Sequence, residues 1–507
     1  MEQNTLVPNA FSFRRVFVLL AATTAIAACD IQPQPLTDSE LMSIAQGRLT
    51  DVVGDDQEPV SGSISLYEAM ARALKYNLDR QVELKEEALR SRELRLSEYD
   101  LLPDLVAQAE YTDRDNDPGS RSVNLETDST SSTATRSSER DELDGDLTLT
   151  WDVLDFGISY NRSKQRADDV LIALEQRRAA TNRVIEDTRS AYWRAVSAQR
   201  LLGQIRTLKT QGDSALGRSS ELVASEEADP RTQLEFQRDL LENQQTLEQL
   251  SRDLSIAKRQ LAALMNLPIG SDFTVDMPNR GQHRSHLDMS RDDMILSAMI
   301  NRPELREISY RQRRNEQEGP IATLEAIPGL QVFVGTNFSD NDLLENQEWV
   351  TTGARLSWNL MRLARLPERR RNIEAGGELL DTRALALTQA VATQVMVSRA
   401  RYQSLHREYH AAERFRGVQR RLTQQVQREF NAGTATEQEL MNERFEQLVA
   451  ELRTDVAFAD MQNAFANLYA SMGLDSYDAE LTGNEPVAEM ADVLKGWWQA
   501  RGDRTIN

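Results

Sequence analysis

The chain has 507 residues, and its 80 aspartates and glutamates outnumber its 59 lysines and arginines, which gives a net charge of −21 at pH 7. This acidic balance argues against a nucleic-acid-binding protein, because such a protein needs a basic surface. Cys29 is the single cysteine, so an internal disulfide and a zinc site made of cysteines are excluded.

Residues 1–28 are expected to be a bacterial secretory signal peptide. A pair of arginines is followed by an apolar run of about 11 residues, which is too short to span a membrane. Ala27 and Ala28 then precede Cys29, as in a lipoprotein signal that is cleaved before a cysteine that then carries lipid. The alternative is an ordinary cleavage after Ala28, with Cys29 incidental. No later stretch approaches about 18 uninterrupted apolar residues, so a membrane-spanning role would require strands.

The chain after residue 62 contains an internal repeat. Trp151 matches Trp358 and Met265 matches Met472, and the sequence numbers within both pairs differ by 207. An offset that persists without a gap over so long a stretch indicates a tandem duplication.

The spacing is longer in front of these pairs. The numbers of Pro103 and Pro328 differ by 225, and those of Asn77 and Asn301 differ by 224. The change in offset from 225 to 207 means that the first half carries an insertion, which falls in the Ser/Thr/Asp-rich stretch 113–144. We expect that stretch to be a loop.

Each half is expected to consist of a helix, a strand, a loop, a second strand and a long helical hairpin. The first helix is predicted over 66–101 and again over 292–326, and each copy ends before a proline. Proline-free stretches of strong helix formers predict the hairpin helices, over 159–225 and 232–265 in the first half. Since the returning helix is about half as long as the first, two shorter helices stacked end to end are expected to lie beside each long one.

Four segments alternate apolar and polar residues with the period of a β-strand, at 105–111, 146–153, 330–338 and 352–360. In the second segment Leu147, Leu149 and Trp151 share one face. The segments are long enough to cross a bilayer as tilted strands. The alternative is a soluble sheet, but the helix-rich flanks offer no second sheet or compact core to cover the apolar face.

Four strands cannot close a membrane barrel alone, because the smallest single-chain barrels have eight. An open sheet edge is not tolerated in lipid. Closure therefore requires more than one chain, and three copies would supply twelve strands.

Taken in order, these segments resemble the TolC-like outer-membrane efflux protein family over about residues 63–475. The resemblance is carried by the first helix at 65–77, the helix-to-strand steps at 102–103 and 327–328, the strand-to-helix exit at 149–157 and the hairpin tip at 430–433. No single motif is decisive, but the same order occurring twice is specific.

The resemblance implies a mainly α protein with membrane β-strands. Its fold is a tandem-duplicated protomer of long antiparallel helical hairpins plus four β-strands, which trimerises into a 12-stranded β-barrel continued by a periplasmic α-helical barrel. The implied function is a passive exit duct in the cell outer membrane, belonging to a tripartite efflux or type I secretion system. The implied partners are a periplasmic adaptor (membrane fusion) protein and an inner-membrane pump, with no catalytic residue, cofactor or metal.

The expected organisation has six parts. They are the signal peptide (1–28), a lipid-anchored N-terminal linker (29–62), the first TolC-like repeat (63–270), an inter-repeat linker (271–290), the second TolC-like repeat (291–475) and a C-terminal tail (476–507).

The hairpin tips are the expected docking site for the adaptor. The tip residues are Glu226, Glu227 and Asp229 in the first half and Asn431, Ala432, Gly433, Thr434 and Ala435 in the second. Gly433 permits a tight reversal with positive φ, whereas Glu226 takes that place in the first half, so the two tips are expected to engage the adaptor differently. The resemblance also places a tunnel constriction near Asp229 and Glu439; the alternative is that both carboxylates face outward and are solvated.

A rival interpretation is a structural or adaptor lipoprotein without a pore, a coiled-coil spacer tethered by Cys29. Asp30, directly after that cysteine, favours it, because in some bacteria this residue retains a lipoprotein at the inner membrane. An adaptor would have one central hairpin, whereas this sequence has two. His406 and His410 lie at i, i+4, and a solvated helix face is favoured over a metal site because no further ligand is evident.

Overall fold

The computed structural model describes residues 34–53, 57–136, 138–225, 229–268, 270–277, 289–474, 481 and 483–500. The chain divides into two units, 1–56 and 57–507, which are described separately. In the first unit, the segment expected to be a linker contains a helix, α2 (Asp38–Val53), whose described side chains are all exposed. Cys29 lies outside the described residues.

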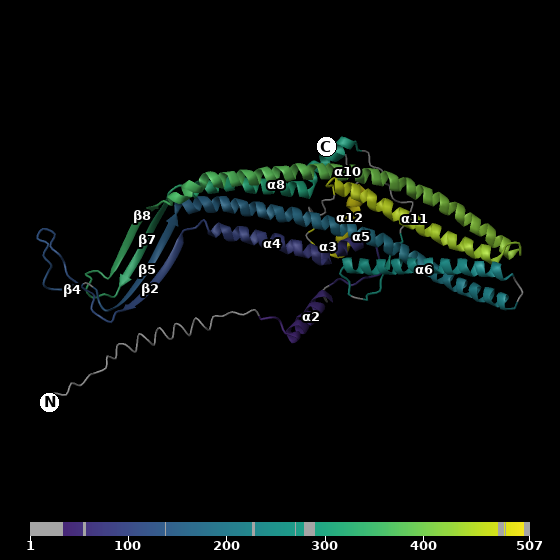
Figure 1. Cartoon of the computed structure of the whole chain (residues 1–507), viewed down its shortest axis with the longest axis horizontal. Helices are drawn as coiled ribbons and strands as arrows, with labels where there is room; N and C mark the ends of the chain where they lie inside the picture. Colours follow the sequence, from purple (N-terminus) through teal and green to yellow (C-terminus); the bar gives the residue numbers. More distant parts are fainter. Residues whose placement is uncertain are drawn as a thin grey trace, which may run out of the picture. The chain divides into compact units, whose positions relative to one another are not determined.

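The second unit begins with the elements of the first half (Figure 1). They are β1 (Ser63–Ile64), α3 (Leu66–Tyr76), α4 (Leu78–Tyr99), β2 (Asp104–Asp113), β3 (Gly119–Ser120), β4 (Thr135–Arg136), β5 (Asp141–Asp152), α5 (Val153–Ala224), α6 (Pro230–Leu264) and β6 (Thr274–Val275).

The second half repeats the order of the main helices and the long strands. Its elements are α7 (Arg291–Asn301), α8 (Pro303–Glu316), α9 (Glu318–Leu324), β7 (Gly329–Ser339), β8 (Glu348–Ser357), α10 (Leu360–Asn431) and α11 (Glu437–Ser471), and α12 (Val487–Ala500) follows them.

The structure confirms the duplication. Val153 and Leu360, which begin α5 and α10, are related by the same offset as the two tryptophans, and both helices have 72 residues. The helices α6 and α11 keep this offset and both have 35 residues. Upstream of β5 and β8, equivalent positions differ by the larger offset that relates Pro103 to Pro328. The starts of α4 and α8 show this offset. At this larger offset Asn77 corresponds to Arg302, so its expected match with Asn301 is wrong by one position.

The expectation of one continuous first helix in each half is also wrong. Asn77 has an extended backbone (φ −65°, ψ 125°) between α3 and α4, and its side-chain oxygen accepts a hydrogen bond from the Arg80 N–H at 3.3 Å. This cap starts a new helix. In the second half Pro303 begins α8, and a residue before proline avoids the helical region, so Arg302 is extended.

The long hairpins are present as predicted, although α5 begins earlier than expected. Asp152 caps it by accepting hydrogen bonds from the N–H groups of Leu154 and Asp155, at 3.0 and 3.1 Å. At a rise of about 1.5 Å per residue, 72 residues extend for about 108 Å. Both α4 and α6 pack against α5, which confirms the expected pair of shorter helices beside a long one. No described helix combines the length and apolar character needed to cross a membrane.

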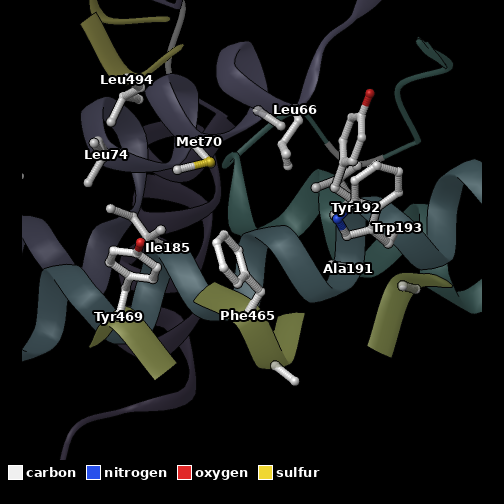
Figure 2. Close-up of a cluster of buried hydrophobic side chains, with 14 of the residues drawn as sticks. Leu66, Met70, Leu74, Ile185, Ala191, Tyr192, Trp193, Phe465, Tyr469 and Leu494 are labelled. Atoms are coloured by element: carbon white, nitrogen blue, oxygen red, sulfur yellow. The ribbon is translucent and has the colours of Figure 1, made fainter. Parts of the chain in front are cut away.

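One buried cluster joins the short helices to the long ones near the middle of α5 (Figure 2). It includes Leu66, Met70 and Leu74 of α3, Ile185, Tyr192 and Trp193 of α5, Phe465 and Tyr469 of α11, and Leu494 of α12. The Tyr192 hydroxyl donates to the Asp276 carbonyl at 2.9 Å, which ties β6 to this cluster. The helix of the C-terminal tail, α12, packs against α3, and its Trp498 ring centre lies 4.5 Å from the Arg189 guanidinium of α5.

Candidate functional site

The four long strands form one antiparallel sheet in the order β2-β5-β7-β8. The loop predicted over 113–144 is shorter than expected, because β2 ends at Asp113 and β5 begins at Asp141, and it contains the small hairpin β3–β4. Among the described residues, no strand pairs with the outer edge of β2 or of β8. Each chain therefore presents two open edges, as the strand count predicted.

One face of this sheet is apolar and uncovered. Its residues are Leu105, Ala107, Ala109 and Tyr111 of β2, Leu143, Leu147, Leu149 and Trp151 of β5, Leu330, Val332, Val334 and Phe338 of β7, and Val350, Ala354 and Leu356 of β8. Even on the central strands these side chains remain exposed, as for Leu147 (44%) and Val334 (43%). A soluble sheet would bury this face; here nothing in the described chain covers it.

The opposite face is mainly polar and carries many acidic residues, although Phe333 of β7 and Trp349 of β8 also lie on it. Away from the helices, a group of carboxylates lies on it, Glu110 on β2 and Glu142, Asp144 and Asp146 on β5. Glu110 lies directly opposite Asp144, and the Ser339 hydroxyl donates to Glu142 at 2.9 Å. Within β2, β5, β7 and β8, Arg355 of β8 is the only basic residue. The sheet is thus apolar on one side and mainly polar and acidic on the other, and the described chain covers neither side with a hydrophobic core.

The first hairpin tip is described only at its end, because Glu226 and Glu227 lie outside the described residues. Asp229 is the N-cap of α6, and its carboxylate accepts hydrogen bonds from the Thr232 hydroxyl at 2.7 Å and the Thr232 N–H at 2.9 Å. These bonds hold the pKa of the exposed Asp229 carboxyl below its usual range.

The second tip turns at Gly433, whose φ of +76° agrees with the expected glycine turn. Asn431 ends α10, and Ala432 is its C-cap. The Thr434 N–H donates to the Glu429 carbonyl at 2.9 Å and closes the turn, and Ala435 follows it. A Cβ atom at Gly433 would meet no atom within 4 Å, so the tip faces open space.

Glu439 lies one turn into α11 and belongs to a capping box. Its carboxylate accepts a hydrogen bond from the Thr436 N–H at 2.7 Å, while the Thr436 hydroxyl accepts one from the Glu439 N–H at 3.2 Å. The bonds from Thr436 lower the pKa of this exposed carboxyl. Both carboxylates of the predicted constriction thus cap helices in the single chain.

The two hairpins are joined near their tips. The Arg218 side chain of α5 forms an ion pair with Glu437 at the start of α11, with Nε 3.2 Å from a carboxylate oxygen. Arg444 of α11 donates to Gln211 of α5 at 2.9 Å. A cleft of about 550 Å³ lies between these contacts and is lined in part by Phe430 of α10. The tips therefore belong to one connected end of the helical layer.

His406 and His410 place their ring centres 4.6 Å apart on α10. Burial is the main cause that lowers the pKa of His406, and the neighbouring His410 adds to it. His406 is half-buried, its ring 6.0 Å from that of Tyr402, whereas His410 is exposed, as expected for a solvated helix face. Among the described residues no group of three or more metal-ligating side chains is found.

The acidic inner face and Arg355 were not singled out as functional from the sequence. The alternation of β5 and β8 already placed Asp146 and Arg355 on the polar side. Only the register between strands, which the structure supplies, shows which polar residues stand opposite one another.

No family model and no curated protein matches this sequence. Solved structures, however, are similar in fold over most of the chain. The Campylobacter jejuni CmeC outer-membrane channel is 11% identical, with a TM-score of 0.64 over 93% of this chain and 97% of that one. The Neisseria gonorrhoeae MtrE outer-membrane channel is 15% identical (TM-score 0.62; 83% and 94%). The Vibrio cholerae outer-membrane protein VceC is 12% identical (TM-score 0.60; 80% and 96%). The chain therefore has the fold of these outer-membrane proteins, as its resemblance to TolC-like proteins predicted.

Proposed function

We propose that this chain is one protomer of a trimeric, TolC-like outer-membrane channel that conducts substrates passively out of the cell. The sheet carries this proposal, because its outward face is apolar, its inward face is acidic and both its edges are open. An apolar face without a cover suits lipid, and a charged face suits a water-filled lumen.

The need to close the barrel determines how many chains it contains. Backbone groups at a strand edge must be paired in lipid, so β2 and β8 require partner strands. Three copies of this four-stranded sheet supply twelve strands, a size that leaves a lumen. The helices that continue from β5 and β8 would then form the wall of a tunnel below the barrel.

The proposed partners are a periplasmic adaptor protein and an inner-membrane pump of an efflux or type I secretion system. A tunnel wall about 100 Å long carries the hairpin tips far from the membrane strands. The tips are the parts of this wall best placed to meet an adaptor. We further propose that Cys29 carries a lipid anchor in the outer membrane.

Conductance in planar bilayers tests the channel directly. Purified protein should have the mass of three chains in detergent and should open ion-conducting pores of uniform size. The rival lipoprotein spacer would insert no pore. A monomeric protein that conducts ions would contradict closure by three copies, and a trimer without conductance would favour the spacer.

A further inference from the structure

We propose that β8 of one protomer pairs with β2 of the next in a defined register, with Arg355 directly opposite Glu110 of the neighbouring protomer. This inference rests on the proposed function, because it assumes that the barrel closes between copies of this chain. It goes further by assigning the residues that meet at each seam.

The duplication relates the two open edges to an interface that is already present. The offset that joins the two tryptophans relates β5 to β8, and the larger offset that joins the two prolines relates β2 to β7. The strands β5 and β7 pair with each other inside one chain. The missing β8–β2 seam between chains is therefore the repeat equivalent of the β5–β7 seam within the chain.

The internal seam gives the register. It pairs the stretch of β5 from Asp144 to Asp152 with β7, and within it Thr148 lies opposite Gly335. Adding 207 to the number of Thr148 leads to Arg355, and subtracting 225 from that of Gly335 leads to Glu110. The same transfer places Leu356 opposite Ala109.

The faces of the two strands agree with this register. Leu356 and Ala109 both belong to the apolar outward face, whereas Arg355 and Glu110 both belong to the inward face. A slip by one residue would set outward residues against inward ones along the whole seam.

Registers displaced by two residues would also pair inward residues with inward ones, and charge distinguishes the proposed register from them. A shift in either direction sets Arg355 opposite Gln108 or Thr112, which carry no charge. Within its own chain Glu110 lies opposite Asp144, and like charges directly opposite each other destabilise a sheet. An arginine on the other side of Glu110 offsets this repulsion. In the described chain neither Arg355 nor Glu110 has an ion-pair partner of its own.

Paired cysteines test the register. Cα atoms directly opposite in an antiparallel pair are about 4.5–5.5 Å apart, within reach of a disulfide, whereas diagonal neighbours at about 7–8 Å are beyond it. Under mild oxidation Glu110→Cys with Arg355→Cys should give a covalent trimer as the main product on denaturing gels. Gln108→Cys or Thr112→Cys, each with Arg355→Cys, should give little covalent trimer. Each of these substitutions made alone serves as a control, which should show no linkage through Cys29.

Charge reversal tests the ion pair. Glu110→Arg or Arg355→Glu alone should lower the temperature at which the detergent-resistant trimer dissociates, and the two together should restore it. Glu142→Gln neutralises an inward carboxylate on the central strand β5 and keeps its acceptor, so this control should leave that temperature unchanged.

The outcomes separate this proposal from the function on which it rests. Preferential cross-linking at residue 108 or 112, in a protein that is trimeric and conducts ions, overturns the register and leaves the channel intact. A monomeric mass with no cross-link in any pair overturns the channel as well. A double reversal that restores nothing overturns the Arg355–Glu110 contact even where the cysteines support the register.

Discussion

Asp229 and Glu439 stabilise two equivalent helix starts from opposite ends of the first turn. In α6 the N-cap is Asp229, and its carboxylate accepts hydrogen bonds from Thr232, three residues later. In α11 the N-cap is Thr436, and the carboxylate is on Glu439, three residues later. The two halves have exchanged the threonine and the acid while keeping one carboxylate and one hydroxyl in each cap.

This exchange allows a clean test of the proposed acidic constriction. Asp229→Asn with Glu439→Gln removes six charges from a trimer, and both amides keep an acceptor for the cap. If these carboxylates line the narrow end of the tunnel, the preference for cations in single-channel recordings should fall.

A matched control neutralises two exposed carboxylates within the same helices, Asp253→Asn with Glu446→Gln. This control should leave the selectivity unchanged. Equal selectivity in the tip variant and the wild-type protein would mean that Asp229 and Glu439 serve only as outward-facing caps.

The two faces of β5 predict opposite effects for one substitution at neighbouring positions. Leu149→Arg places a charge on the outward face, where the cost in lipid rises to about 2–4 kcal/mol towards the middle of a bilayer, and should reduce membrane assembly. Thr150→Arg places the same side chain on the inward face, where water can solvate it, and should assemble normally with altered conductance. Extraction of the folded trimer from membranes measures both; equal loss would contradict the assigned faces.

Much of this fold could be predicted because two independent sequence patterns, the alternation of strands and the proline-free stretches of helices, recur in both halves. The alternation around Trp151 and Trp358 located β5 and β8, and the absence of proline located the long helices. The offset that joins these tryptophans also relates the bounds of α5 and α10 position for position.

The breaks in the first helices could not be predicted with the same rules. Asn77 interrupts a sequence whose helical pattern continues on both sides, and only its cap on Arg80 and its contact with α6 show why. Its amide also donates to the Leu264 carbonyl at 3.3 Å, a partner 187 residues away. Such long-range contacts, like that of Trp498 in α12 with Arg189 of α5, are decided by packing that a local pattern does not contain.

The two roles of Asn77 can be separated by substitution. Asn77→Ala removes the cap of α4 and the contact with Leu264, and should lower the free energy of unfolding by about 1–2 kcal/mol. Asn77→Asp keeps the cap acceptor and loses the donated bond, so it should fall between the wild-type protein and Asn77→Ala. Helical circular dichroism during thermal unfolding measures the series. Equal midpoints for all three proteins would contradict a stabilising role.

Cys29 is predicted to carry the lipid and to take no part in barrel closure. Cys29→Ser should abolish metabolic labelling with palmitate, whereas the trimer should persist, because closure depends on the strand edges. Native mass measurement and labelling of the same preparation check both parts. A variant that loses both the label and the trimer would show that the anchor is needed for assembly.

The hairpin tips are predicted to bind the adaptor, with the second tip making more of the contact. Residues 431–435 are small and uncharged and surround the open space at Gly433, so another helical hairpin can approach this backbone closely. Gly433→Trp fills that space and should block pump-dependent export while trimers and purified-channel conductance remain. Because φ is +76°, any other L-residue is strained there by about 1–2 kcal/mol, so Gly433→Ala is the matched control for strain without bulk.

The acidic first tip is expected to make a weaker, salt-dependent contact, because exposed charges are screened by ions. Glu226→Ala with Glu227→Ala should therefore reduce export less than Gly433→Trp does. The alternative is that both tips are solvated turns, since loop tips often tolerate change. Normal export in the Gly433→Trp strain at normal protein level would favour that alternative. An equal loss in Gly433→Ala would assign the effect to the strained turn, and a block confined to the tryptophan would place the adaptor on the second tip.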